Sequence, residues 1–228
     1  MLCKIADLLV EVPEAGGMAP RLGSYAARDG LTPDFRIREE MYDIKRWPGL
    51  DPKNLAYMDS GWFFYLKLLT YDGLMLHASA VELDGAAYLF SGPSGMGKST
   101  HTRLWKSVFP DARIFNDDKP ALRNIDGVWY AYGTPWCGKN GININMKVPV
   151  AGICFLRRGE ENSIKRLPPV MAAAAVVSQT VNSFVNEKGH RYMMDNVTRL
   201  VTDIPIYELY SKPEPEAALL SYNTMKKR

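Results

Sequence analysis

Residues 91–100 read Ser-Gly-Pro-Ser-Gly-Met-Gly-Lys-Ser-Thr, and residues 92–99 fit the pattern G-x-x-x-x-G-K-[ST]. Peptide N–H groups can wrap an anion only where no Cβ obstructs the backbone, so the three glycines mark positions of positive φ or close approach. Residues 88–90 predict a strand that enters this loop, and residues 98–108 predict a helix that leaves it. Strand, loop and helix together favour a phosphate-binding loop over an ordinary glycine-rich turn.

The chemistry of such a loop assigns a role to each part of the stretch. The backbone would wrap the α- and β-phosphates, Lys98 would reach the β- and γ-phosphates, and the Ser99 hydroxyl would hold Mg²⁺. The positive end of the helix that follows points at the anion. We therefore predict ATP and Mg²⁺ as cofactors. The predicted nucleotide-binding residues are Gly92, Pro93, Ser94, Gly95, Met96, Gly97, Lys98, Ser99 and Thr100.

Composition and charge exclude several classes of protein. With 228 residues, 46% of them hydrophobic, the chain can bury a sizeable core. The net charge of +3 is mild and the basic residues are dispersed except for a solvated tail at 226–228, so nucleic-acid and membrane binding gain no support. Lys4 and Asp7 interrupt the first apolar run, and no window reaches the roughly 18 apolar residues of a membrane span, which predicts a cytoplasmic protein. The three cysteines lack C-x-x-C spacing and are read as reduced thiols.

The first third of the chain predicts a small covering lobe. Residues 4–12 alternate and predict one strand, residues 19–27 a short helix, and residues 34–38 another strand. From residue 54 the apolar positions follow one helical stripe that ends near the Asp-Gly pair at 72–73. We predict an N-terminal α+β covering lobe over residues 1–70 and a kinase-like domain built on the phosphate-binding loop over residues 71–228.

A predicted hairpin brings His77 to the glycine-rich loop. Residues 74–83 alternate, the Asp-Gly pair at 84–85 is a type I′ turn signal, and residues 86–90 alternate again. With this turn, paired residues sum to 169, which sets His77 opposite Gly92. A histidine in an apolar strand is by itself more often a core residue, but the register favours a role at the nucleotide. A slip of one residue would turn the side chain to the other face.

Two adjacent carboxylates close the next predicted strand. Residues 111–115 predict a strand that follows a crossover, and Asp117 and Asp118 come directly after it. We expect this strand to be a parallel neighbour of the strand that enters the loop. Because the carboxyl ends of neighbouring parallel strands share one edge of the sheet, both side chains should lie beside the phosphate-binding loop. The alternative is a solvated turn. Neighbours in an extended segment point opposite ways, so one aspartate can face Mg²⁺ while the other faces the acceptor.

The rest of the chain predicts further strands and helices. A hairpin is expected at residues 121–132, a buried strand at 148–156 that pairs with 163–167, helices at 170–184 and 187–201, a strand at 204–209 and a helix from 214. The loop at 135–141 carries Trp136, Cys137 and Lys139 between glycines. It is either a substrate-binding rim, with Lys139 meeting an anionic group, or a loop packed by Trp136.

The residues 76–80, the loop at 92–99 and the aspartate pair resemble the kinase domain of HPr kinase/phosphorylase, a bacterial enzyme that phosphorylates a serine of a small carrier protein. ATP-dependent phosphoenolpyruvate carboxykinase has a related loop and aspartate pair. The resemblance covers about residues 74–155 and implies an α/β fold: a mixed sheet with flanking helices around the phosphate-binding loop, with the core shared by the two families.

The resemblance also implies roles for single residues. His77 and Lys98 would contact the transferring phosphoryl group, and Asp118 would be the base that accepts the proton of the attacking hydroxyl. Ser99 would bind Mg²⁺, and Asp117 would assist the metal or orient the base. An Asp that accepts a hydroxyl proton is the usual arrangement in kinases.

The chain also departs from this family. The loop at 133–139 contains no acid where the family supplies a metal-binding Glu, and residues 1–70 show no counterpart of its regulatory domain. Pro93 and Thr100 replace residues that are commonly acidic. Three arginines, at 157, 158 and 191, are each candidates for a later arginine of the family. These differences point to a shorter relative with another substrate.

We therefore predict a kinase that transfers the γ-phosphoryl group of ATP to a hydroxyl, a serine of a peptide or small protein, or a small-molecule hydroxyl acceptor. A carboxykinase-like reaction on a small organic acid is a second interpretation. A module that binds ATP without transfer is a third, kept open by the missing Glu. No nucleic-acid or membrane partner is expected, and a homo-oligomer is compatible with the family.

Overall fold

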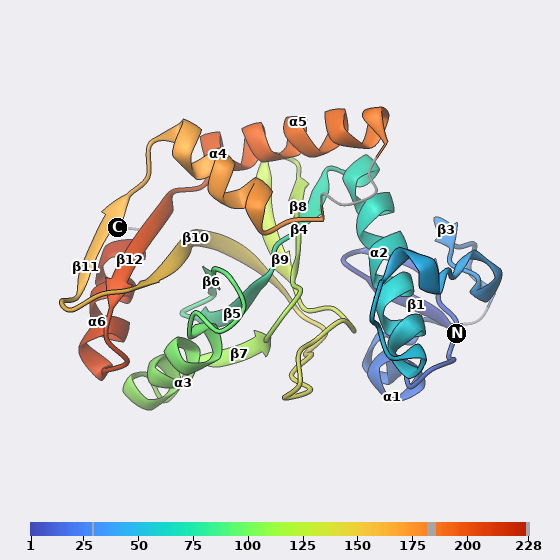
Figure 1. The fold of residues 1–228 in the computed structure, drawn as a ribbon, viewed down its shortest axis with the longest axis horizontal. Coiled ribbons are helices and arrows are strands. Elements are labelled where there is room, and N and C mark those ends of the chain that lie inside the picture. Colours follow the sequence, from blue (N-terminus) through green and yellow to red (C-terminus); the bar gives the residue numbers. More distant parts are fainter. Residues whose placement is uncertain (29, 182–185, 227–228) are drawn as a thin grey trace.

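The computed structural model describes residues 1–28, 30–181 and 186–226. A curled mixed sheet dominates it, with helices on both faces (Figure 1). The strands of this sheet are β4 (Gly73–Met75), β5 (Ala78–Leu83), β6 (Ala86–Ser91), β7 (Arg113–Asn116), β8 (Ala121–Ile125), β9 (Val128–Tyr132), β10 (Lys147–Arg158), β11 (Ser163–Arg166) and β12 (Ile206–Ser211). Their order is β4-β8-β9-β10-β6-β5-β7, with β12 on β10 and β11 on β12. The predicted mixed α/β fold is confirmed at this level.

The long strand β10 makes the sheet curl. Its first residues pair antiparallel with β9, and its later residues pair parallel with β6 on one edge and with β12 on the other. The register against β6 shifts between Val150 and Gly152, where a bulge bends the strand. One strand therefore belongs to two half-sheets that face different directions.

Helices cover both faces because the central strands are apolar on both. Helices α4 (Pro169–Ser178) and α5 (Glu187–Asp203) lie together on one side, and α3 (Lys98–Val108) and α6 (Pro215–Met225) on the other (Figure 1). Along β6, Leu89 packs into the core under α4 and α5, and its neighbour Phe90 packs against Trp105 of α3. This alternation follows from the two-residue period of a strand.

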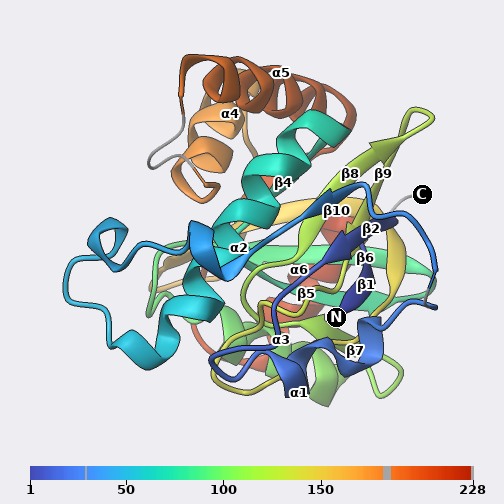
Figure 2. The same ribbon diagram turned by 90° about the vertical axis from the view of Figure 1, so that its right-hand side faces the viewer.

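The N-terminal residues form a second, small sheet beside helix α2 (Leu55–Leu68) (Figure 2). This sheet consists of β1 (Leu2–Ile5), β2 (Leu8–Glu11) and β3 (Phe35–Arg36), and the short helix α1 (Ala19–Leu22) lies between β2 and β3 in the chain. Single 3₁₀ turns join these elements: η1 (Gly23–Tyr25), η2 (Glu39–Met41), η3 (Ile44–Arg46), η4 (Pro52–Asn54) and η5 (Leu69–Tyr71). One apolar cluster joins Val10 of β2, Phe64 of α2 and Trp136 of the later loop, so the side chains pack across residue 70. The division into two domains there stays a prediction.

Local signals fixed several elements correctly. Helix α3 spans the predicted residues, and Asp84 and Gly85 both have positive φ, as a type I′ turn requires. The predicted register of the hairpin is also confirmed, since Leu83 pairs with Ala86 and Ala78 with Ser91.

Four sequence-based predictions need correction. Residues 4–12 are a hairpin, because Ala6 and Asp7 adopt left-handed φ of 51° and 59° and turn the chain between β1 and β2. Residues 74–83 are split between β4 and β5. Strand β11 pairs with β12 and not with β10, since β12 lies between them. The helix predicted for 170–184 ends at Ser178; residues 182–184, like residues 227 and 228 of the predicted tail, lie outside the described residues.

None of the helices in the described part of the chain combines the length and the apolar character that crossing a membrane requires.

Candidate functional site

The loop between β6 and α3 turns on three glycines with positive φ. Gly92, Gly95 and Gly97 have φ of 145°, 78° and 102°, a region that residues with a Cβ rarely adopt. Gly97 is the N-cap of α3, and its carbonyl accepts the first helical bond, from His101 N at 2.8 Å. Because the first N–H groups of a helix have no partner within it, α3 presents donors at the end of this loop.

Lys98 lies over the loop that precedes it. The side chain is buried, with 9% exposure, and Nζ donates to the carbonyls of Gly92 and Pro93 at 2.7 and 3.2 Å. Burial lowers the pKa of Lys98, and the charge of Asp118 opposes that shift. The two carbonyls therefore hold the ammonium at the loop, where the negative charge of Asp118 still raises its pKa.

His77 lies in the gap between β4 and β5. Pairing with β6 stops at Ala78 opposite Ser91, one residue before the expected partner of Gly92. The His77 carbonyl still accepts a bond from Ser91 Oγ at 2.8 Å, so the residue is tied to the strand end that begins the loop. On its other side, His77 N donates to Gln179 O at 2.7 Å. The ring is 31% exposed and is thus not packed into the core.

The His77 ring meets Asp118. Its Nε2 lies 3.2 Å from Oδ1 of Asp118, and the Asp118 carbonyl accepts from Ala78 N at 3.0 Å. The other carboxylate oxygen, Oδ2, is bonded by Lys119 Nζ and by the Tyr57 hydroxyl. Three of these residues, Asp118, Lys119 and Tyr57, line a cavity described below as the cleft. We call His77, Asp118, Lys119 and Tyr57 the cleft cluster.

The charge of Asp118 is stabilised by its neighbours. Burial raises the pKa of this carboxyl, but the hydrogen bond from His77 and the charge of Lys119 outweigh burial and hold the pKa below its usual range. Asp118 is consequently an anion at neutral pH, 21% exposed, with cationic or polar donors on both oxygens.

Asp117 points to different partners. Its Oδ1 accepts from Gly138 N at 2.6 Å, while Oδ2 is buried and has no hydrogen-bond partner among the described residues. A Cβ on Gly138 would come within 3.2 Å of both oxygens, so a glycine suits this contact. Asn116 fixes the turn, because its Oδ1 accepts from the backbone N–H groups of Asp118 and Lys119 at 3.1 and 2.9 Å.

The strands that carry these residues are arranged differently from the prediction. Strand β7 is not a direct neighbour of β6, because β5 lies between them and pairs antiparallel with both. Strands β6 and β7 are nevertheless parallel, so the glycine-rich loop and the aspartate pair leave the sheet at the same edge. His77, at the start of β5, lies at that edge too.

The loop at 135–141 is packed by its tryptophan. Trp136 is fully buried, stacks on Phe64 with ring centroids 4.7 Å apart, and donates from Nε1 to Ser60 Oγ at 3.0 Å. Cys137 lies next to Arg21, whose Nη1 is 2.8 Å from Sγ, and burial raises the pKa of the thiol. For Trp136 the packing interpretation is therefore correct, whereas Lys139 is exposed on the rim of the cleft.

A cavity of about 460 Å³, which we call the cleft, opens over Asp118. Its walls come from the N-terminal residues, from α2 and from the loop at 137–139, and they carry the cations Arg21, Lys119 and Lys139. Sequence reasoning missed Tyr57 and Arg21, which lie more than 60 residues away from Asp118 and follow no motif. Lys119 directly follows the predicted pair, but it was assigned no role from the sequence.

Of the three candidate arginines, Arg157 and Arg158 both line the cavity beside the glycine-rich loop, and Arg158 bonds the loop itself. Arg158 Nη2 donates to Gly95 O at 3.3 Å, and the residue lines a cavity of about 400 Å³ with Gly97, Thr100 and Lys212. Arg157 instead pairs with Glu208 at 3.0 Å. Arg191 pairs with Glu187 along α5.

Comparison with known proteins places this chain in a family. Residues 51–212 match the model described as "SynChlorMet cassette protein ScmC". No curated protein matches the chain. Among solved structures, the Hpr(Ser) kinase/phosphatase from Coxiella burnetii aligns with a TM-score of 0.39 and 12% identity, over 65% of this chain and 86% of that one. A likeness this distant does not carry function.

Proposed function

We propose that this chain, which belongs to the family of SynChlorMet cassette protein ScmC, is an ATP-dependent kinase that phosphorylates a hydroxyl, a serine of a peptide or small protein. The observation that carries the proposal is the cleft cluster at the sheet edge where the glycine-rich loop begins. His77 joins the two parts, since its ring meets Asp118 at 3.2 Å and its carbonyl is bonded by Ser91.

The glycine-rich loop suits the phosphates of a nucleotide. Left-handed glycines at its turns and the helix N-terminus of α3 present backbone donors, and Lys98 adds a positive charge. The cavity beside Arg158 extends from the same loop and offers space for the nucleoside. We infer that residues 92–100 bind the triphosphate of ATP.

Magnesium fits the residues present only together with a phosphate. The described residues hold no group of three or more His, Cys, Asp or Glu that could form a cage. Among the described residues, Oδ2 of Asp117 is buried and accepts no hydrogen bond, so a cation could bind it. Mg²⁺ needs one or two carboxylates, and phosphate oxygens and water complete its shell. Asp117 and Ser99 would hold the ion, which would neutralise charge on the phosphates.

The cleft cluster supplies what transfer to a hydroxyl needs. The acceptor oxygen forms a bond to the γ-phosphorus, the bond from that phosphorus to the bridging oxygen breaks, and ADP leaves. Asp118 accepts the acceptor's proton, and Lys98 and His77 stabilise the negative charge of the phosphoryl group. Because its pKa is low, Asp118 takes the proton late, when the new bond has already acidified the hydroxyl.

Lys119 and Tyr57 would position the base. Both bond Oδ2 of Asp118, and the other oxygen, Oδ1, contacts only His77 among these residues. The covering lobe at 1–70 would close the cleft over the acceptor, since Arg21 and Tyr57 both contact the carbonyl of Cys137, at 3.2 and 3.0 Å. Exclusion of water from the cleft would favour transfer over hydrolysis.

One observation favours a second candidate, a module that binds ATP without transferring it. Residues 133–139 contain no acid, so fewer metal ligands are available than a kinase commonly uses. Binding of ATP would be the same in the two candidates. They differ in whether Asp118 takes part in a reaction.

The decisive experiment is phosphoryl transfer from γ-labelled ATP with Mg²⁺ to a panel of serine peptides. Asp118→Asn should lower transfer at least about 10³-fold while ATP binding and the circular dichroism spectrum persist. The exposed Asp111→Asn on the same segment is the matched control and should transfer at the wild-type rate. Tight ATP binding with no transfer to any acceptor would favour the sensor, and unchanged transfer by Asp118→Asn would remove Asp118 as the base.

A further inference from the structure

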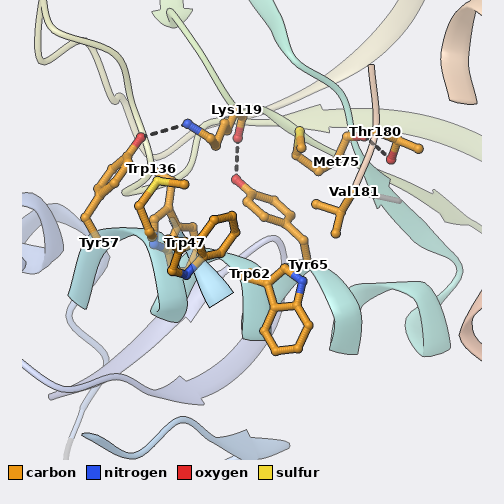
Figure 3. Close-up of a pocket in the computed structure, with 11 residues that line it drawn as sticks. Trp47, Tyr57, Trp62, Tyr65, Met75, Lys119, Trp136, Thr180 and Val181 are labelled. Atoms are coloured by element: carbon orange, nitrogen blue, oxygen red, sulfur yellow. Dashed lines mark hydrogen bonds between the residues drawn. The ribbon is translucent and has the colours of Figure 1, made fainter. Parts of the chain in front are cut away.

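A third cavity opens next to the cleft, on the side of α2 (Figure 3). It measures about 190 Å³. Aromatic rings and sulfur-containing side chains supply most of its wall, as Figure 3 shows. The lining residues are Trp47, Tyr57, Met58, Gly61, Trp62, Tyr65, Met75, Lys119, Trp136, Thr180 and Val181. We call this cavity the aromatic pocket.

The polar groups of the wall are engaged with the protein itself. Trp136 Nε1 donates to Ser60 Oγ at 3.0 Å, and Trp47 Nε1 donates to Asp59 Oδ1 at 2.6 Å. The Tyr65 hydroxyl donates to Lys119 O, and the Thr180 hydroxyl donates to Met75 O at 2.6 Å. Since these donors are already used, the pocket offers mainly ring and methyl carbon to an occupant. An apolar group is therefore the matching guest.

The volume of the pocket suits one ring. Apolar cavities of about 150 Å³ in proteins bind benzene. A Phe or Leu side chain is therefore small enough to enter a cavity of about 190 Å³. Rings in such a wall also prefer offset or edge-on contacts with an aromatic guest, which add to the free energy of burial.

The aromatic pocket shares a wall with the cleft above Asp118. Tyr57, Met58 and Lys119 line both cavities, and two of the three bond the Asp118 carboxylate. A group in the aromatic pocket thus lies one side chain away from the base. Beyond Asp118 the cleft wall is cationic, with Arg21 and Lys139, which suits the carbonyl and carboxylate groups of a peptide.

We propose that the acceptor is a peptide segment whose phosphorylated serine has a large apolar side chain within two residues of it, and that this side chain binds in the aromatic pocket. The proposal rests on the kinase function above and adds the recognition element. Backbone carbonyls of the segment would lie along the cationic wall while the serine hydroxyl reaches Asp118.

Separate measurements of peptide binding and of phosphoryl transfer distinguish this proposal from the kinase function. A set of serine peptides in one background carries Phe at −2, −1, +1 or +2, and a reference peptide carries Ala at all four positions. Tryptophan fluorescence without ATP measures binding, because three tryptophans line the pocket. At least one Phe peptide should bind about 10- to 100-fold more tightly than the Ala peptide, the gain from burying one large side chain. In transfer assays the same peptide should show a lower KM.

A variant that fills the pocket provides the specific control. Met58→Trp places a ring from the wall into the cavity and should remove the preference for Phe, so that the Phe and Ala peptides bind with equal affinity. Met194→Trp on the exposed face of α5 is the matched control and should keep the preference. Equal binding of the Phe and Ala peptides by the wild type would overturn the proposal, even if transfer occurs. Preferential binding without transfer to any peptide would support the pocket and contradict the kinase function.

Discussion

Two polar clusters flank the glycine-rich loop, and they differ in exposure to solvent and in charge. The cleft cluster centres on the Asp118 anion, and the side chains of His77, Asp118 and Lys119 in it are 21–31% exposed. The helix-packing cluster, made of His101, Trp105 and Ser221, lies between α3 and α6 and is 0–4% exposed. In it, Trp105 Nε1 donates to Ser221 Oγ at 2.9 Å, and Ser221 Oγ donates to Ala218 O at 3.0 Å.

The hydrogen bonds of the helix-packing cluster form a closed set. Because the Ser221 proton goes to Ala218, the contact of 3.2 Å between His101 Nε2 and Ser221 Oγ requires the proton on Nε2. Burial lowers the pKa of His101 to about 4, so the ring is neutral. A closed and neutral network supports the helix, whereas the open and charged cleft cluster can exchange partners with a substrate. Proximity to a motif residue alone does not distinguish the two.

The largest expected effect tests the loop itself. Lys98→Ala should reduce transfer by at least about 10³-fold, because one preorganised charge on a transferring phosphoryl group contributes about that much. Stability should change little, since in the part of the chain that the structure describes Nζ bonds two loop carbonyls. Lys106→Ala, an exposed lysine of the same helix, is the control and should match the wild type in both assays. Wild-type turnover in Lys98→Ala would refute the role of this lysine.

A buried aspartate outside both clusters sharpens the contrast. Asp59 on α2 is 0% exposed and accepts three bonds of 2.6 Å, from Asp43 N, Arg46 Nη1 and Trp47 Nε1. Asp59→Ala should lower the free energy of unfolding by about 3 kcal/mol, because it leaves a largely buried guanidinium without its partner. Urea denaturation measures the change, with the exposed Glu40→Ala as control. A loss below about 1 kcal/mol would show that this network can relax into water.

Much of the site was predictable where the signal was local. The loop, the start of α3 and the turn at 84–85 follow from glycines and from an Asp-Gly pair, whose backbone conformations few other residues adopt. The turn alone predicted the strand register that places His77 beside the loop. Asp117 and Asp118 diverge as expected for neighbours in an extended segment.

The rest depended on tertiary contacts. Tyr57 reaches Asp118 from 61 residues away in the sequence, and nothing in its helix distinguishes it from a packing residue. Asp59 on the same helix is buried only because the turn at 43–47 folds back over it. Ala6 and Asp7 form a tight turn although Ala-Asp is not a turn signal, which hid the first hairpin. Pairing of β11 was equally unpredictable, since β12 enters between β10 and β11 from later in the chain.

The helix-packing cluster predicts a smaller, purely structural effect. Ser221→Ala removes the acceptor of two buried N–H groups, those of Trp105 and His101, and should cost about 2–3 kcal/mol of stability. Ser107→Ala on the exposed side of α3 should cost much less, because the Ser107 hydroxyl is in contact with water. Both are read from urea midpoints at neutral pH. If folded Ser221→Ala lost most of its transfer activity, the cluster would have a part in the site and not only in packing.

The smallest effect is a pH dependence that arises from His101. Its pKa is about 4 in the folded protein and about 6.5 in the unfolded chain, so the unfolded state binds more protons between these values. Stability should therefore be complete above about pH 6.5 and fall as the pH decreases toward 4, by about 2 kcal/mol at pH 5. His101→Gln, which keeps a donor for Ser221, should flatten this part of the curve relative to the wild type. An NMR titration of the imidazole signals gives the direct measurement. A midpoint near 6.5 for His101 would mean that water reaches the helix-packing cluster, and the contrast with the cleft cluster would then be lost.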